Sequence, residues 1–325
     1  MEKKIVLLSY FMSDEKKQKV LDTFQPEGYK VVFCETEDEV VDAAEGAEIV
    51  YASGATHGFE VARKAGPGLK WFCSLTAGVD ALLRPGALPE GCILTNGAGA
   101  FGLTIAEHLV MVTLMLLRRY PEYSAGVRQH NWIGQLKMRS IYNSRFTILG
   151  TGDIGTRFAE RIRPFGPARV VGLNRSGQKK SEAYDEVASI QHLEEYLPET
   201  DVLVMCLPGT PETKHIMNED RIAMLPESAY VVNVGRGSSI NQEAIAKALN
   251  EGRLAGAALD VFDVEPLPKD DPLWETKNLI LTPHNSGKMT LEYTRSKNVD
   301  MLCENFKNYL AGDKMLYSVD LKLGY

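Results

Sequence analysis

Short apolar runs and charged amphipathic stretches alternate along residues 1–100. Short apolar runs are typical of buried strands, and the stretches between them repeat apolar positions at helical spacing. The expected strands are residues 4–9, 30–34, 48–52, 70–75 and 92–95, and the expected helices are residues 13–24, 36–44 and 59–65. Thr36 and Glu39 form a capping box at one helix start. The pattern predicts a parallel sheet covered by helices.

A glycine-rich stretch, residues 97–102, interrupts this pattern, and a long apolar helix follows it. We expect the helix to begin at Thr104, because Glu107 completes a second capping box. The stretch is interpreted as the first crossing between two domains. Residues 120–145 show no clear periodicity, and we expect them to form an arm that packs on a partner subunit.

The alternation of strands and helices resumes at residue 146. The expected strands are residues 146–149, 169–173, 201–207, 230–234, 254–259 and 279–282. Asn241 caps an expected helix over 242–251 that Gly252 ends, and a last amphipathic helix is expected over 290–311. The second half of the chain therefore also predicts a parallel α/β sheet.

Composition narrows the functional classes. A length of 325 residues suits two domains, and the net charge of −7 argues against a general nucleic-acid or acidic-membrane surface. The five cysteines form no C-x-x-C pair, which favours a reducing compartment. The apolar runs 5–8 and 109–117 are too short for a signal peptide or a bilayer span, so we expect a cytoplasmic protein. The six histidines show no metal-ligand spacing, and no metal is expected.

The sequence G-x-G-x-x-G, with Gly150, Gly152 and Gly155, lies between an expected strand and an expected helix over 156–165. The first glycine permits a tight turn, the second lets the backbone approach a pyrophosphate, and the third lets the helix pack on the strand. The helix N-terminus then favours the phosphates. Because a second strand follows at the right distance, the stretch predicts a dinucleotide site.

Three further stretches follow expected strand ends: Asn233 to Gly237, Asp260 to Pro266, and Thr282 to Gly287. Ligand crevices in open α/β sheets form at these ends, so Arg236, Glu265 and His284 could converge. Taken singly, each residue could equally be a solvated loop residue.

Together with the glycine fingerprint and the turn Thr76 to Asp80, these stretches resemble the D-isomer-specific 2-hydroxyacid dehydrogenase family, in its glyoxylate/hydroxypyruvate reductase-like branch. The resemblance implies two doubly wound parallel-sheet domains of the α/β class. A flavodoxin-like substrate domain would comprise residues 1–100 and 289–325. A Rossmann cofactor domain, residues 101–288, would be inserted into it.

The resemblance also implies roles. Arg236 would bind the substrate carboxylate and keto oxygen, and Glu265 with His284 would transfer the proton. Thr76, Ala77 and Gly78 would bind substrate through their turn, with Asp260 on the nicotinamide amide and Thr213 on a phosphate. The full implied cofactor set is Thr104, Gly150, Gly152, Asp153, Ile154, Gly155, Asn174, Arg175, Ser176, Cys206, Leu207, Pro208, Thr213, Val234, Gly235 and Asp260.

The chemistry of these side chains suits such roles. Reduction of a 2-oxo acid needs a hydride at the carbonyl carbon and a proton at its oxygen, and histidine is the usual proton source near neutral pH. An ionised Glu265 hydrogen-bonded to the ring of His284 would favour the imidazolium form. The planar guanidinium of Arg236 can bind two oxygens at once, which lysine cannot do.

The residues after the second Rossmann strand predict the cofactor. An acidic residue there would bind the ribose hydroxyls of NAD and repel the 2′-phosphate of NADP. Here Asn174, Arg175 and Ser176 replace it, and Lys179 and Lys180 add positive charge. We therefore expect a preference for NADP(H), with NAD(H) as the alternative.

The leading hypothesis is an NAD(P)H-dependent reductase of a small 2-oxo acid, acting as a homodimer without nucleic-acid or membrane partners. Two alternatives stay open from the sequence. One is a 3-phosphoglycerate dehydrogenase-type oxidation within the same class. The other is a dinucleotide-sensing scaffold resembling the transcriptional corepressors of this fold.

Overall fold

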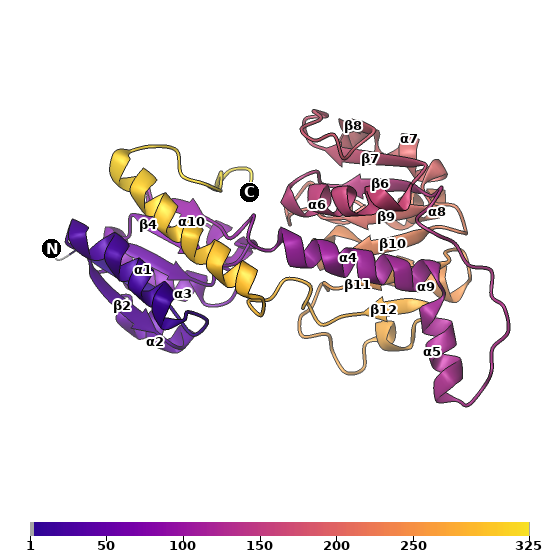
Figure 1. Cartoon of the computed structure of the whole chain (residues 1–325), viewed down its shortest axis with the longest axis horizontal. Helices are drawn as coiled ribbons and strands as arrows, with labels where there is room; N and C mark the ends of the chain where they lie inside the picture. Colours follow the sequence, from indigo (N-terminus) through magenta and orange to yellow (C-terminus); the bar gives the residue numbers. More distant parts are fainter. Residues whose placement is uncertain (1–2, 325) are drawn as a thin grey trace. The chain divides into compact units, whose positions relative to one another are not determined.

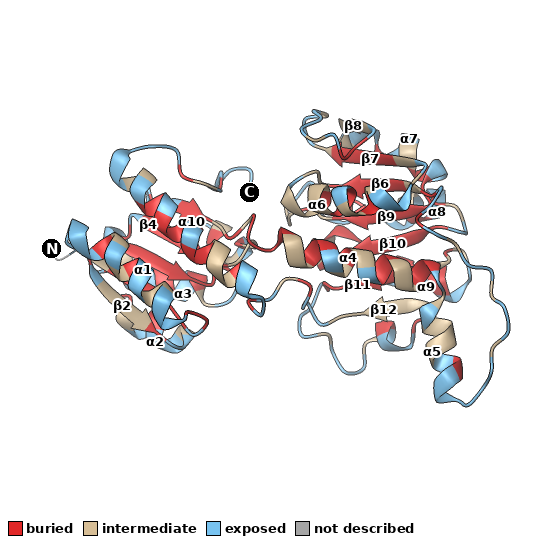
Figure 2. Cartoon of the chain, viewed as in Figure 1, coloured by how far each residue is buried: buried red, intermediate tan, exposed pale blue. Residues whose placement is uncertain are grey.

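The computed structural model describes residues 3–324. The chain divides into two compact units. The first unit comprises Met1–Phe101 and Lys288–Tyr325, and the second comprises Gly102–Gly287 (Figure 1). Each unit is built around its own parallel sheet, with strands buried under helices (Figure 2).

The first unit holds a five-stranded sheet in the order β2-β1-β3-β4-β5. Its strands are β1 (Lys4–Leu8), β2 (Lys30–Cys34), β3 (Ile49–Ala52), β4 (Trp71–Ser74) and β5 (Ile93–Thr95). Its helices are α1 (Asp14–Phe24), α2 (Glu37–Ala43), α3 (Gly58–Ala65) and α10 (Glu292–Ala311). All pairs are parallel, and this order is the flavodoxin-like one.

Local sequence explains why the helices of this unit begin where they do. Ser13 accepts a hydrogen bond from the N–H of Lys16, and Thr36 accepts one from the N–H of Glu39. These side chains satisfy N–H groups that the first helical turn leaves unpaired. The late helix α10 joins the early part of the chain through Phe306, which stacks on Phe24 at a ring distance of 3.8 Å.

The second unit holds a seven-stranded parallel sheet in the order β12-β11-β10-β9-β6-β7-β8. Its strands are β6 (Arg145–Leu149), β7 (Arg169–Asn174), β8 (Glu186–Ser189), β9 (Val202–Met205), β10 (Tyr230–Asn233), β11 (Gly256–Leu259) and β12 (Leu279–Leu281). Its helices are α4 (Gly102–Leu117), α5 (Tyr120–Arg128), α6 (Asp153–Ile162), α7 (Leu193–Tyr196), α8 (Glu219–Met224) and α9 (Gln242–Asn250). The strand order reverses between β6 and β9, as in the Rossmann fold. The predicted α/β class, with two doubly wound parallel sheets, is confirmed.

Helices cover both faces of the larger sheet. On one face, α8 and α9 contribute Ile222, Ile245 and Leu249 to a core that also contains Leu203 and Val231. On the other face, α6 packs Phe158 against Phe146 of β6, and α4 lies against α6, β10 and β11. Because both faces are covered, the central strands are continuous apolar runs, which made them predictable.

The start of α4 differs from the prediction. The helix begins at Gly102, so Thr104 lies inside its first turn instead of capping it. A Cβ atom at residue 102 would collide with the Asp153 side chain, so the first turn packs directly on the start of α6. Tertiary packing therefore outweighs the local capping signal.

Residues 120–145 are more ordered than their sequence pattern indicated. The first part is helix α5, with Pro121 near its start, and the segment after it folds back on the helix. The hydroxyl of Tyr123 accepts a hydrogen bond from Leu136 N–H at 3.0 Å and donates one to the carbonyl of Gly134. Trp132 is 97% exposed.

Strand β8 was not predicted. Each of its four residues is only partly buried, and the strand lies at the edge of the sheet beyond β7. Edge strands tolerate charged residues such as Glu186, so they lack the apolar run by which the inner strands are recognised. Within residues 3–324, no helix is long and apolar enough to cross a membrane.

Candidate active site

The carboxyl ends of the parallel strands lie along one edge of the larger sheet, and most of the predicted site residues follow them directly. The glycine turn follows β6, Arg236 follows β10, Asp260 follows β11, and His284 follows β12. Ligands of open α/β sheets bind at this edge, next to the reversal of strand order.

The turn after β6 has the geometry of a phosphate-binding loop. Gly150 has φ +94°, and a Cβ atom there would lie 2.7 Å from the carbonyl oxygen of Cys206. A Cβ atom at Gly155 would collide with the carbonyl of Gly150, so only glycine lets α6 start this close to the strand. The space beside Gly152 is open, and this residue caps α6. Asp153 and Ile154 form the first turn of α6, with N–H groups available at its start. The loop therefore fits a dinucleotide pyrophosphate.

The loop after β7 is organised by Asn174. Its Nδ2 donates to the Thr151 hydroxyl at 2.7 Å, and its Oδ1 accepts from Gly177 N–H at 2.7 Å. These bonds tie the end of β7 to the glycine turn. Arg175 and Ser176 lie exposed at the surface of this loop. Lys179, which the sequence suggested as further positive charge, forms an ion pair with Glu182 at 2.9 Å.

The loop after β9 carries Cys206, Leu207 and Pro208. Cys206 continues the strand, since its N–H donates to the carbonyl of Leu149 at 2.8 Å. The hydroxyl of Thr213 donates to the carbonyl of Pro208 at 2.7 Å and accepts from Thr210 N–H. In this conformation Thr213 closes its own loop, and a phosphate contact would compete with these bonds.

Arg236 is presented by a short turn at the end of β10. Asn233 donates to the carbonyl of Arg236 at 2.9 Å and accepts from Gly235 N–H at 3.0 Å. Val234 donates to the carbonyl of Met205, which holds the turn against β9. A Cβ atom at Gly235 would lie 2.6 Å from the Leu207 carbonyl oxygen, so the two loops pass in close contact. The Arg236 side chain is partly exposed.

Glu265 and His284 form a hydrogen-bonded pair. His284 Nδ1 lies 2.6 Å from Glu265 Oε2, and the Phe262 N–H donates to Glu265 Oε1 at 2.8 Å. The His284 side chain is 49% exposed and the Glu265 side chain 34% exposed. The carboxylate therefore fixes Nδ1, and the second ring nitrogen is left for other contacts.

The surroundings of Glu265 favour its ionised form. Burial acts to raise the pKa of Glu265. The hydrogen bonds from His284 and Phe262, together with the charges of His284 and Arg236, outweigh burial and hold this pKa below its usual value. A Cβ atom at Gly237 would collide with the backbone of Phe262, so the turn that carries Arg236 lies against the loop that carries Glu265.

Asp260, directly after β11, is buried, with 2% of its surface exposed. Its oxygens accept hydrogen bonds from the Thr282 hydroxyl at 2.6 Å, from Asn285 N–H at 3.0 Å and from Ser286 N–H at 3.1 Å. The Ser286 hydroxyl is a fourth donor. His108 of α4 lies beyond Thr282, with Nε2 3.4 Å from its hydroxyl. Burial lowers the pKa of His108, and the nearby Asp260 carboxylate only partly opposes this.

The predicted substrate turn, Thr76 to Gly78, belongs to the first unit and follows β4. Its carbonyl groups are held from within that unit. The carbonyl of Thr76 accepts from Ser74 Oγ at 2.9 Å and from Gly97 N–H at 2.9 Å. The carbonyl of Ala77 accepts from Asn96 Nδ2 at 2.9 Å, and that of Gly78 from Thr76 Oγ1 at 2.8 Å. The turn is thereby fixed in shape.

Sequence reasoning missed the residues that support the site. Thr151, Asn233, Ser286 and His108 were not singled out for a role, yet each hydrogen-bonds a predicted site residue or its anchor. Polar residues directly beside a strand end are a weak signal of such support, because a buried hydroxyl or amide needs a partner.

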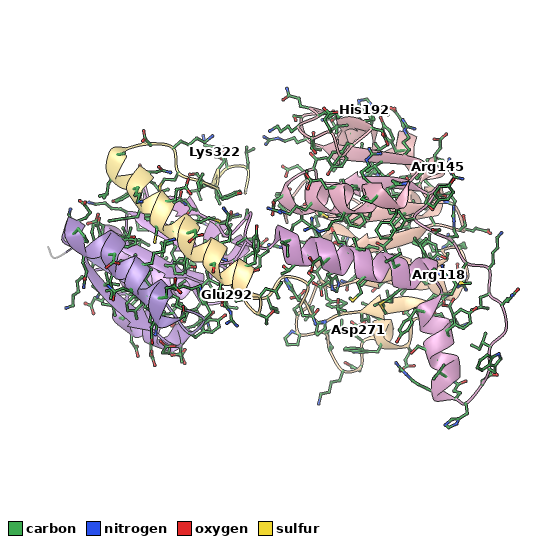
Figure 3. The ribbon with its side chains drawn as sticks, viewed as in Figure 1. Arg118, Arg145, His192, Asp271, Glu292 and Lys322 are labelled. Carbon is green, nitrogen blue, oxygen red and sulfur yellow. The ribbon has the colours of Figure 1, made fainter. Side chains whose placement is uncertain are left out.

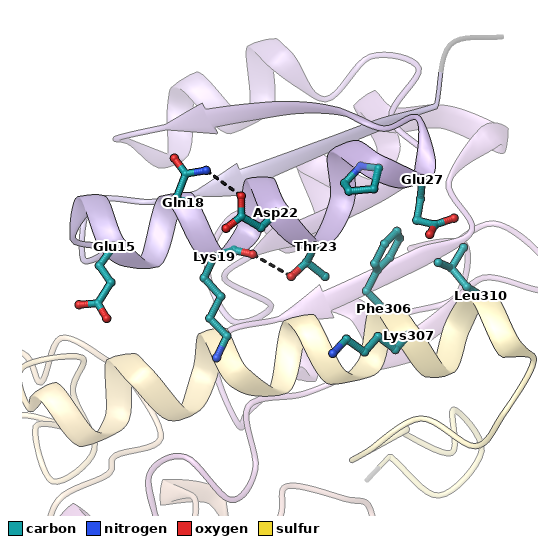
Figure 4. A pocket seen from close by; sticks show the side chains of 10 residues that line it. Glu15, Gln18, Lys19, Asp22, Thr23, Glu27, Phe306, Lys307 and Leu310 are labelled. Atoms are coloured by element: carbon teal, nitrogen blue, oxygen red, sulfur yellow. Dashed lines mark hydrogen bonds between the residues drawn. The ribbon is translucent and has the colours of Figure 1, made fainter.

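One other hollow and His192 lie away from these residues. A surface groove between α1 and α10 of the first unit carries mixed charge, including Glu15, Lys19 and Lys307 (Figure 4). None of the predicted site residues lines this groove. His192 hydrogen-bonds Glu195 at 2.8 Å near the edge strand β8 (Figure 3). Residues 3–324 contain no group of three or more His, Cys, Asp or Glu side chains that could hold a metal ion.

Comparison with known proteins agrees with this architecture. Residues 110–286 match the family described as D-isomer specific 2-hydroxyacid dehydrogenase, NAD binding domain. A glyoxylate/hydroxypyruvate reductase A from Klebsiella pneumoniae is 33% identical over 270 residues, covering 80% of this chain and 83% of that protein. A D-3-phosphoglycerate dehydrogenase from Methanocaldococcus jannaschii is 30% identical over 280 residues, and the match covers 86% of this chain but only 52% of that protein.

Among solved structures, the chain is similar to an NADPH-dependent glyoxylate/hydroxypyruvate reductase from Sinorhizobium meliloti in complex with NADP and sulfate. The TM-score is 0.82 at 27% identity, and all of both chains is covered. The predicted family resemblance is confirmed by these matches. The chain therefore belongs to the D-isomer-specific 2-hydroxyacid dehydrogenase family, and it is an NAD(P)-dependent oxidoreductase of the class that reduces 2-oxo acids.

Proposed function

We propose that the protein reduces a small 2-oxo acid, of the glyoxylate or hydroxypyruvate kind, to the D-2-hydroxy acid. The observation that carries the proposal is the Glu265–His284 hydrogen bond beside Arg236, at the sheet edge where ligands bind. The similarity to glyoxylate/hydroxypyruvate reductases supports the choice of substrate. We assign the second unit to the cofactor and the first unit to the substrate.

Substrate binding and proton transfer would fall to different residues of the chain. Arg236 would bind the carboxylate and keto oxygen of the substrate through forked hydrogen bonds. Backbone N–H groups of Ala77 and Gly78 would bind the carboxylate. The ring of His284 would donate a proton to the carbonyl oxygen while Glu265 stabilises the imidazolium form. A bound nicotinamide supplies the hydride that reduces the carbonyl carbon.

A panel of 2-oxo acids, each assayed with NADH and NADPH, tests the activity directly. The proposal expects turnover of glyoxylate or hydroxypyruvate above that of larger 2-oxo acids. The similarity to a 3-phosphoglycerate dehydrogenase motivates one further arm, oxidation of 3-phosphoglycerate. Faster oxidation of that substrate than reduction of any 2-oxo acid would favour the oxidative alternative.

The loop after β7 supports NADP(H) as the preferred cofactor. Asn174 carries no negative charge, and its hydrogen bonds shape the loop from which Arg175 and Ser176 extend. A guanidinium and a hydroxyl suit a phosphate dianion. The Sinorhizobium meliloti relative is described as NADPH-dependent, which favours the same preference here.

A homodimer is also proposed. The exposed apolar side chains of α4, α5 and the segment after α5 lie in one stretch of sequence: Met111, Tyr120, Val127, Trp132, Met138 and Tyr142. Such a concentration of exposed apolar groups is typical of an interaction surface, and symmetric dimers are the commonest soluble oligomers.

The substitution His284→Ala is expected to lower kcat for 2-oxo acid reduction by about 10²- to 10⁴-fold, the usual contribution of a positioned general acid. Steady-state kinetics measure kcat, and a fluorescence titration measures the Kd for NADPH. This Kd should change little. A kcat within a few-fold of wild type would remove His284 from the mechanism.

For Glu265→Gln we expect a shift in the pH–rate profile of reduction. The pKa of Glu265 is held low, so the wild-type carboxylate is ionised throughout the neutral range and favours the protonated ring. The neutral amide of the variant stabilises the imidazolium less than the carboxylate does, so the alkaline limb of the profile should move to lower pH. An unmoved alkaline limb would mean that the pair is not coupled.

Arg236→Lys should damage catalysis although the charge is kept. An ammonium cannot bind two oxygens in forked geometry, and hydrogen bonds to charged groups are worth about 1.5–3 kcal/mol. The expected loss in kcat/KM for the 2-oxo acid is roughly ten- to a hundredfold. If the substitution weakens only NADPH binding, Arg236 belongs to the cofactor site.

Arg175→Ala is expected to raise KM for NADPH by roughly ten- to a hundredfold, the loss of about 1.5–3 kcal/mol from a charge-assisted bond. Kinetics with NADH should hardly change. Lys64→Ala is the control, because Lys64 is an exposed cation on α3 of the first unit. A wild-type enzyme with higher kcat/KM for NADH than for NADPH would contradict the assignment.

Sedimentation at micromolar concentration should give a species of twice the 36.0 kDa chain mass. Trp132→Ser should weaken this dimer, since the side chain is 97% exposed and removing it costs no core packing. Met224→Ser, an exposed apolar position on α8, serves as control. A single 36.0 kDa species would exclude the dimer.

A further inference from the structure

Asp260 accepts hydrogen bonds from residues on both sides of His284 in the sequence. The carboxylate accepts from the Thr282 hydroxyl before the histidine, and from Asn285 and Ser286 after it. Asp260 is itself fixed, because its N–H donates to the carbonyl of Asn233 on β10 at 3.0 Å. The turn that carries the proposed proton donor is therefore anchored to the sheet through one buried side chain.

The anchoring matters because the histidine has an uncommon backbone conformation. His284 has φ +46°, in the left-handed region, and its N–H donates to the carbonyl of Thr282 at 2.9 Å. A residue without glycine's freedom persists there only when surrounding contacts hold it. Four hydrogen bonds to Asp260 from the residues on either side, two of them from hydroxyl groups, hold the turn, and the Glu265 carboxylate holds the ring.

The same contacts bear on the role of Asp260. A carboxylate offers about four acceptor sites, and the turn provides four donors. Thr282 and Ser286 therefore fill the positions at which a nicotinamide amide would otherwise donate. In this arrangement Asp260 holds the turn that carries His284 in place.

We infer that Thr282 and Ser286 are positioning residues for His284, holding its turn in the productive conformation through Asp260. The inference rests on the proposed function, because their positioning affects rate only if His284 donates the proton. Each hydroxyl supplies one of the four hydrogen bonds that fix the turn, so loss of either loosens the position of the ring beside Glu265. Misplacement of a catalytic group by about 1 Å can cost on the order of a hundredfold in rate.

The test compares three substitutions that each delete one buried or half-buried hydroxyl. Ser286→Ala and Thr282→Val each remove one of the two hydroxyl donors to Asp260. Thr276→Val is the matched control, because Thr276 is 8% exposed in the same unit and its hydroxyl donates to the carbonyl of Pro272, outside the turn. For each variant, kcat, the Kd for NADPH and the melting temperature are measured, and Thr282→Ser is added as the conservative rescue.

The inference expects kcat to fall by about 10- to 100-fold in Ser286→Ala and Thr282→Val, with the Kd for NADPH within about twofold of wild type. Thr276→Val should keep wild-type kcat even where its melting temperature falls, and Thr282→Ser should recover most of the rate lost in Thr282→Val. This pattern separates positioning from loss of stability.

Three outcomes would overturn the inference. The first is a kcat within threefold of wild type in both turn variants. The second is a loss of kcat that follows melting temperature equally in Thr276→Val. The third is a weakening of NADPH binding as large as the loss in kcat. That result would mean that Asp260 binds the nicotinamide amide, as the family resemblance implied. The proposed function itself fails only if the wild-type protein reduces no 2-oxo acid with either NADH or NADPH, so the two failures are distinguishable.

Discussion

The parallel direction of the strands in the larger sheet is the constraint on which the site depends. When all strands run the same way, every carboxyl end lies at one edge, and the loops that leave this edge become neighbours. The glycine turn after β6, Arg236 after β10 and His284 after β12 are distant in sequence but share this edge. Parallel strands need crossover helices, and these helices bury both faces of the sheet. The apolar core and the polar edge therefore have one cause.

At that edge, the buried carboxylate of Asp260 holds the loop that presents the more exposed His284 side chain. Asp260 is almost fully buried and uses all its acceptor positions inside the protein. Glu265 and His284 keep a third to a half of their side chains exposed. Burying a carboxylate is costly unless hydrogen bonds compensate, and four donors do so for Asp260. Glu265 and His284, the proposed reactive pair, therefore remain solvent-accessible while the turn that carries His284 is held by hydrogen bonds to a buried group.

The apolar inner strands and several helix caps could be predicted because their signals are local. An inner strand of a covered sheet is apolar throughout, and Thr36 and Asn241 cap their helices as expected. The edge strand β8 and the start of α4 could not be predicted, since partly exposed Glu186 and the contact of Gly102 with Asp153 depend on tertiary neighbours. The anchoring of the His284 turn was also hidden. Its donors lie 22 to 26 residues from Asp260, and no periodicity encodes such a contact.

Asn174 was expected to contact the cofactor directly. Its hydrogen bonds show that it also determines the conformation of the loop after β7. Its identity indicated only that a carboxylate was missing from the ribose site. In the folded chain, Nδ2 binds Thr151 in the glycine turn while Oδ1 binds Gly177 in the following loop. An aspartate could accept from Gly177 but could not donate to Thr151 as the amide does. The amide therefore couples the glycine turn to the loop that carries Arg175, and the proposed preference for NADP(H) depends on loop geometry as well as on charge.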